Sequence, residues 1–209
     1  MGIAALGFRA HSGWAVVVAV GGAVAAPEVI RRERIELADR GITGSVQPYH
    51  AAKQMEIHKA EAFLDRCTET SRAIARNAVQ AMVCGLAEEG YKLSSACILL
   101  GSGRLTKGLA AILAAHAAIH TAEGEFFREA LRLAVESCGL SVSGIKEREV
   151  TSQCGPALRL RPDEIERRIS AMGKAVGPPW RQDEKLCALA GWLMLGRDPT
   201  NILTPVHLA

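Results

Sequence analysis

The stretch LTKGLAAILAAHAAIHTAEGEFFREALRLAVESC, residues 105–138, decides how we expect this chain to fold. At about 100° per residue, the α-helical period, it divides into two faces. The apolar face carries Leu109, Ile112, Leu113, Phe127, Ala130, Leu131 and Ala134, and the opposite face carries Lys107, Glu125, Glu129, Arg132 and Glu136. The stretch therefore predicts an amphipathic helix, with a break near Gly124 and an end at Gly139.

Three polar side chains, His116, His120 and Glu123, lie in the middle of the apolar face. Burying such groups without partners costs several kcal/mol, so they must pair, bind something or line a wet opening in the core. Their i, i+4, i+7 spacing places them within ~60° of one another, which suits a single metal ion or substrate. The alternatives are a buried hydrogen-bond network and a helix whose middle lies at a crevice.

The segments around this stretch predict three strands followed by alternating helices and strands. The expected strands cover residues 2–9, 14–20, 28–38, 96–100 and 140–145, and the expected helices cover 55–89, 105–138, a turn at 147–154, a segment from 162, and 183–195. A turn at Gly21-Gly22 joins the second and third strands. This order predicts an α/β fold with a mixed sheet covered by helices on both faces. Residues 1–196 are expected to form a single domain, and residues 197–209 a loose C-terminal tail.

Composition narrows the class of protein. The chain has 209 residues, of which 49% are hydrophobic, and its net charge of +3 neither requires nor excludes an anionic partner. Its six cysteines form no CxxC pair, which indicates reduced core thiols in a cytoplasmic protein. Residues 14–26 imitate a signal peptide, but their β-branched side chains favour a hairpin. No apolar run reaches the ~20 residues of a membrane helix.

Several local patterns resemble one known family. Leu6-Gly7-Phe8 and the following residues 12–17 are similar to the first hairpin of the ribonuclease H-like fold, in its Holliday-junction-resolvase branch. Residues 122–142 resemble the glycine-containing helix and late strand of that branch. The C-terminal third of the family is similar to four segments of this chain: 145–150, 162–172, 177–179 and 182–190. The resemblance covers most of the chain. It implies a ribonuclease H-like fold, in which carboxylates hold two divalent metal ions beside a phosphodiester.

The chain departs from that family at the expected metal ligands. The first-strand acid is missing, and so is the acid after the central strand; the matching positions hold Phe8, Arg9, Ala10 and Leu100, Gly101, Ser102. Asp183 and Glu184 remain at the start of the last helix. The resemblance therefore implies the fold without ordinary two-metal nuclease activity.

Charged residues at the expected strand and helix ends are further candidates. Arg9 and His11 follow the first strand, where an arginine is suited to hold an anion, although a solvated loop explains them equally well. Asp183 and Glu184 are candidate ligands, although both also complement a helix dipole. Arg104 belongs to a Gly-Ser-Gly-Arg turn, which is either a phosphate contact or simply a tight turn.

The first function consistent with these residues is a binding or assembly role. In it, a polar crevice that includes His11, Arg104 and Glu184 recognises a small anion, a nucleic-acid end or a partner. The basic groups within 31–34 and 159–168 alternate with acids and are interpreted as solvated surface. If they bind nucleic acid instead, binding is expected to depend on salt.

The second function is a metal-dependent hydrolase or nuclease with a rearranged site. His116, His120 and Glu123 hold a divalent metal ion in this hypothesis, and Glu123 acts as a ligand or general base. Arg9 stabilises developing negative charge, and Asp183 completes the candidate catalytic residues. This site needs a further ligand close to the histidines, drawn from His11, His50, Asp183 or Glu184.

Overall fold

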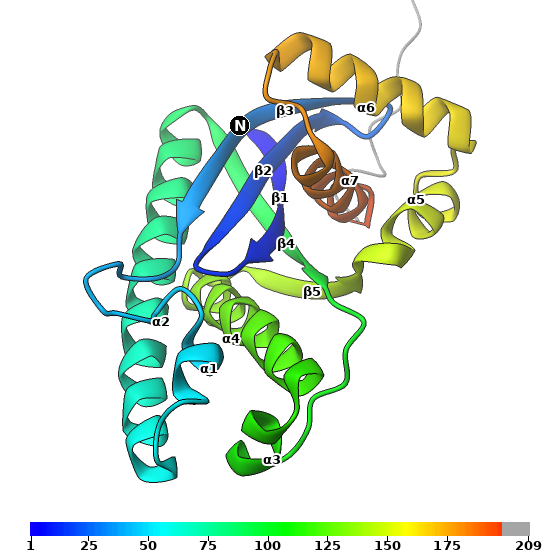
Figure 1. Ribbon diagram of the computed structural model, residues 1–209. Coiled ribbons are helices and arrows are strands. Elements are labelled where there is room, and N and C mark those ends of the chain that lie inside the picture. The colour runs from blue at the N-terminus through cyan, green and yellow to red at the C-terminus, as the bar shows by residue number, and fades with distance from the viewer. Residues whose placement is uncertain (198–209) are drawn as a thin grey trace, which may run out of the picture.

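A five-stranded mixed sheet forms the centre of the fold (Figure 1). The computed structural model describes residues 1–197, so the predicted tail, apart from Arg197, lies outside the described residues. The strand order is β3-β2-β1-β4-β5, with β1 (Gly2–His11), β2 (Trp14–Ala23), β3 (Ala26–Glu36), β4 (Tyr91–Leu100) and β5 (Ser141–Lys146). The first three strands are antiparallel, and β4 and β5 run parallel to β1. The predicted mixed sheet is confirmed.

The turn between β2 and β3 differs from the prediction. Gly21 and Gly22 do not reverse the chain but continue β2 within its ladder to β3. The turn lies three residues later, at Val24 and Ala25. Gly21 permits close packing inside the strand, because a Cβ atom there would lie 3.0 Å from Ile30 Cγ1. The glycine pair was wrongly predicted as a turn because close packing and turn formation favour the same residue.

Helices cover both faces of the sheet, as predicted (Figure 1). One face packs against α2 and α4, and the short helices α1 and α3 contact these two helices. The bounds of the four helices are α1 (Pro48–Ala52), α2 (Ile57–Glu88), α3 (Leu109–Ala114) and α4 (His116–Ser137). The other face packs against α7, flanked by α5 and α6; their bounds are α5 (Val150–Leu158), α6 (Pro162–Val176) and α7 (Gln182–Arg197). A 3₁₀ turn, η1 (Glu147–Glu149), links β5 to α5.

Helix α7 lies unusually close to β1. All residues from Leu186 to Leu195 are buried, so this helix is surrounded by protein rather than lying on the surface. Gly7 in β1 permits the approach, because a Cβ atom there would lie 1.9 Å from the carbonyl oxygen of Cys187. The contact holds the first turn of α7 beside the carboxyl end of β1.

The stretch 105–138 folds as two helices rather than one. The break falls at Ala115, whose backbone is extended at φ −125° and ψ 119°, and Gly124 lies inside α4. The predicted break near Gly124 is therefore wrong, whereas Gly139 follows the helix with the positive φ expected of a C-terminal glycine. As a result, His116 is the first residue of α4.

The cysteines are reduced, and four of the six are buried: Cys67, Cys97, Cys154 and Cys187. Burial raises the pKa of both Cys97 and Cys154 to about 12, so these thiols stay protonated and unreactive. The prediction of core thiols is confirmed for the four buried cysteines and is wrong for Cys84, which is exposed on α2. None of the helices in residues 1–197 is long and apolar enough to cross a membrane.

Candidate functional site

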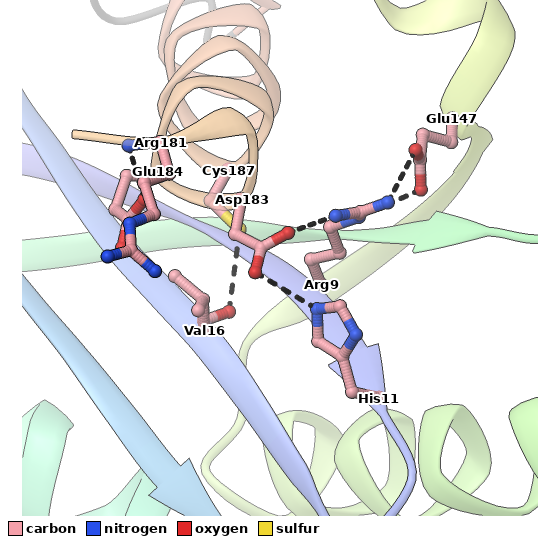
Figure 2. Close-up of polar contacts among 8 residues, drawn as sticks. All are labelled: Arg9, His11, Val16, Glu147, Arg181, Asp183, Glu184 and Cys187. Atoms are coloured by element: carbon pink, nitrogen blue, oxygen red, sulfur yellow. Dashed lines mark hydrogen bonds and ion pairs between the residues drawn. The ribbon is translucent and has the colours of Figure 1, made fainter. Parts of the chain in front are cut away.

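A first polar group lies where β1 ends beside the first turn of α7 (Figure 2). Arg9 extends between two carboxylates. Its Nε and Nη2 atoms donate to Glu147 Oε2 and Oε1 at 2.9 and 2.7 Å, and its Nη1 atom donates to Asp183 Oδ1. His11 Nε2 lies 3.2 Å from Asp183 Oδ2. We call these four residues the ion-pair cluster.

The alternation of β1 places this cluster on the α7 face. Phe8 points into the core under α2 and α4, so Arg9 and His11, one and three residues later, point to the opposite face. Asp183 reaches the same place because α7 begins there, and Glu147 directly follows β5. The two partners of Arg9 therefore come from distant parts of the chain: Glu147 is 138 residues away and Asp183 is 174 residues away.

The ion-pair cluster carries no surplus positive charge. Burial alone would lower the pKa of Arg9, but the hydrogen bonds and charges of Glu147 and Asp183 outweigh it and raise that pKa. Burial also lowers the pKa of His11, against the opposing effect of Asp183, so His11 is neutral at pH 7. One guanidinium therefore faces two carboxylates. Arg9 is already neutralised and is not free to hold an incoming anion.

Two divalent metal ions do not fit the residues at this end of the sheet. Residues 100–102, which follow the buried part of β4, include no carboxylate. Glu184 caps α7, because its Oε2 atom accepts a hydrogen bond from a backbone N–H at 2.7 Å. Asp183 and Glu147 are both paired with Arg9. The guanidinium lies between the carboxylates, in the place where a cation would be held.

A second polar group lies on the other side of the sheet, where α1 meets the start of α4. His50 belongs to α1, and His116 and His120 belong to the first two turns of α4. A ring nitrogen from each of the three lies within 4.8 Å of the others. His116 Nε2 and His120 Nε2 are 3.0 Å apart, and the His50 ring packs edge-on against both rings. With Glu123, we call these residues the histidine cluster.

Glu123 is the buried member of the histidine cluster, with a side chain that is only 4% exposed. Its Oε2 atom is hydrogen-bonded to His50 Nδ1, and the carboxylate also faces the backbone N–H groups of Tyr49 and His50. Burial raises the pKa of Glu123, and the contact with His50 and the first-turn N–H groups of α1 oppose that rise. The carboxylate thus anchors His50 and the N-terminus of α1 to α4.

The structure divides the predicted site residues into these two groups. One contains His116, His120 and Glu123, and the other contains Arg9, His11 and Asp183. Of the further ligands considered, His50 lies beside the histidines. Glu184 caps α7, and Arg104 is exposed in the loop after β4, with no ion-pair partner within residues 1–197. Sequence reasoning did not single out Glu147.

Comparison with solved structures reveals the fold. A structure of Thermus thermophilus RuvC in complex with Holliday junction substrate matches with a TM-score of 0.51 at 9% identity, covering 95% of this chain and 97% of that chain. A second T. thermophilus RuvC structure matches with a TM-score of 0.51 at 8% identity, covering 94% of each chain. No protein-family model and no curated protein matches the sequence. The chain therefore has the fold of these RuvC structures, which confirms the predicted ribonuclease H-like fold.

Proposed function

We propose that this chain is a cytoplasmic ribonuclease H-like protein that binds nucleic acid, or a similar polyanion, without cutting it by two-metal chemistry. One observation carries the proposal: Arg9 lies between Asp183 and Glu147 at the end of β1. The likeness to a structure that holds a Holliday junction supports nucleic acid as the ligand class. The buried, protonated thiols support a reducing compartment.

A guanidinium replaces a metal ion as a charge but not as a catalyst. Arg9 offsets one of the two negative charges of Asp183 and Glu147, which reduces their repulsion of a phosphate backbone. It does not lower the pKa of a bound water molecule, and it does not bridge the attacking and leaving oxygens as two metal ions do. Binding without cleavage is the outcome that this charge arrangement favours.

The loop that follows β4 is the surface on which we expect the phosphates to lie. It leaves the sheet at the same end as Arg9, because β1 and β4 are parallel. Arg104 and Lys107 are exposed in this loop and have no ion-pair partner in the described part of the chain. By contrast, Arg161 is paired with Asp163 at 3.0 Å. Unpaired cations gain more from phosphate contacts, since they exchange no existing ion pair.

Salt-dependent DNA binding tests this proposal. Fluorescence anisotropy with a labelled four-way junction and a linear duplex is expected to show binding that weakens as salt rises. In a plot of log binding constant against log salt concentration, the slope is negative. The Arg104→Ala/Lys107→Ala variant should make this slope shallower by about 2, because two phosphate contacts are lost. Lys174→Ala, an exposed change at the end of α6, is the control and should leave the slope unchanged. Absence of binding at low salt, or an unchanged slope in the double variant, contradicts the proposal.

A second function, metal-dependent hydrolysis, is favoured by the position of His50. It supplies the third imidazole that a rearranged site needs. Arg9 and Asp183 lie on the α7 face, so this hydrolase would work with the histidine cluster alone. In this site Glu123 is hydrogen-bonded to His50, so it is better suited to hold that histidine in position than to act as a general base.

A further inference from the structure

We propose that His50, His116 and His120 form a binding site for one divalent transition-metal ion, with zinc as the expected occupant. The inference goes beyond nucleic-acid binding and holds whether or not the chain binds DNA. It rests on the distances within the histidine cluster, on the buried carboxylate behind it and on its access to solvent.

The spacing of the three rings is close to that of a three-histidine metal site. Tetrahedral zinc with Zn–N distances of 2.0–2.1 Å holds its ligand nitrogens about 3.3 Å apart. His116 Nε2 and His120 Nε2 lie 3.0 Å apart, and a nitrogen from each of the three rings lies within 4.8 Å of the others. Their i, i+4 spacing on α4 keeps both rings on one side of the helix, facing His50.

Glu123 supplies the independent observation that favours an ion here. A carboxylate that accepts a hydrogen bond from one ring nitrogen of a histidine orients the other nitrogen toward a metal. Glu123 Oε2 engages His50 Nδ1, which leaves His50 Nε2 as the nitrogen available for an ion. The same carboxylate faces the first-turn N–H groups of α1, so it holds His50 in place against α4. A cation bound to the same histidine would stabilise the ionised form of this buried carboxylate.

The donor set and exposure indicate which ion binds and what position it leaves open. Three neutral imidazoles suit zinc, copper, iron or nickel, whereas magnesium and calcium prefer oxygen ligands. His116 and His120 are exposed, and the His50 side chain is 26% exposed, so an ion has a path to the site. Three protein ligands with solvent at the fourth position are the arrangement found in catalytic zinc sites.

Metal content and metal uptake test the site. Untagged protein is stripped with a chelator, incubated with Zn²⁺ and passed through a desalting column before its zinc is measured. We expect about one ion per chain, which is lost in His50→Ala and in His116→Ala. Cobalt uptake should give the visible absorption of a tetrahedral site. Glu123→Gln should weaken zinc affinity by about tenfold or more.

His58→Ala is the matched control, because His58 is an exposed histidine on α2 outside the cluster. It should bind zinc as the wild type does. Wild-type protein that is folded and takes up no zinc overturns the inference, whatever the variants do. Zinc uptake that is unchanged in His50→Ala also overturns it, because the ion then binds elsewhere. Neither result depends on DNA binding, so this inference and the proposed function fail separately.

Discussion

Gly7→Ala is expected to reduce the free energy of unfolding by about 3 kcal/mol or more, because it forces α7 away from the sheet. The added methyl group would lie 1.9 Å from the carbonyl oxygen of Cys187 and 2.9 Å from the backbone nitrogen of Gly191. Both are backbone atoms of a buried helix, so no side chain can move aside. A displaced α7 also carries Asp183 away from Arg9. Urea unfolding measures the loss.

Gly155→Ala is the control for this substitution. Gly155 lies inside α5, and the nearest atom to an added Cβ is Leu160 O at 3.4 Å, an ordinary contact. This change should leave stability unaltered or raise it by up to about 1 kcal/mol, since alanine favours a helix over glycine. A Gly7→Ala protein as stable as the wild type would mean that α7 does not approach β1 as described.

Arg9→Asp is expected to convert the ion-pair cluster into a binding site for Mn²⁺ or Mg²⁺. The substitution removes the cation that is paired with Asp183 and Glu147 and adds a third carboxylate. Without metal, the substitution should reduce the free energy of unfolding by about 3 kcal/mol. This is the lower end of the range for breaking a buried ion pair, because these side chains are partly exposed. Metal at about 100 times its dissociation constant should restore about 2.7 kcal/mol. Thermal unfolding with and without Mn²⁺ measures both effects.

Adding Asp183→Asn to the Arg9→Asp protein provides the control. It removes one carboxylate from the cluster, so the stabilisation by Mn²⁺ should be greatly reduced. The wild type should show no comparable stabilisation at this cluster, because Arg9 holds both acids. If Mn²⁺ stabilises the Arg9→Asp protein no more than the wild type, the guanidinium does not lie in a cation's place.

Much of the fold follows from local sequence patterns. The N-terminal strands were predicted from their β-branched side chains and β4 from its apolar run, and the long helix α2 was predicted from its three- and four-residue repeat. Two details depend on tertiary packing and were missed. The break at Ala115 has no glycine or proline signal, and Gly21 serves close packing inside a strand rather than a turn.

The candidate sites were harder to predict, because their contacts join distant parts of the chain. The spacing of His116, His120 and Glu123 identified one face of a helix, but four possible further ligands remained open. Only the packing of α1 on α4 selects His50, which is 73 residues from Glu123. Glu147 carried a weak signal, a charged residue directly after an edge strand. Nothing local indicates that it pairs with Arg9.

The most direct test of the central claim is a cleavage assay with wild-type protein on a labelled four-way junction. The assay uses protein concentrations at which the junction is bound, with Mg²⁺ or Mn²⁺ in excess. Because Arg9 is paired with both acids that would hold metal ions, we predict bound but intact DNA. Cleavage by the wild type that disappears in Asp183→Asn would contradict the account, since it would show a working metal site where we place an ion pair.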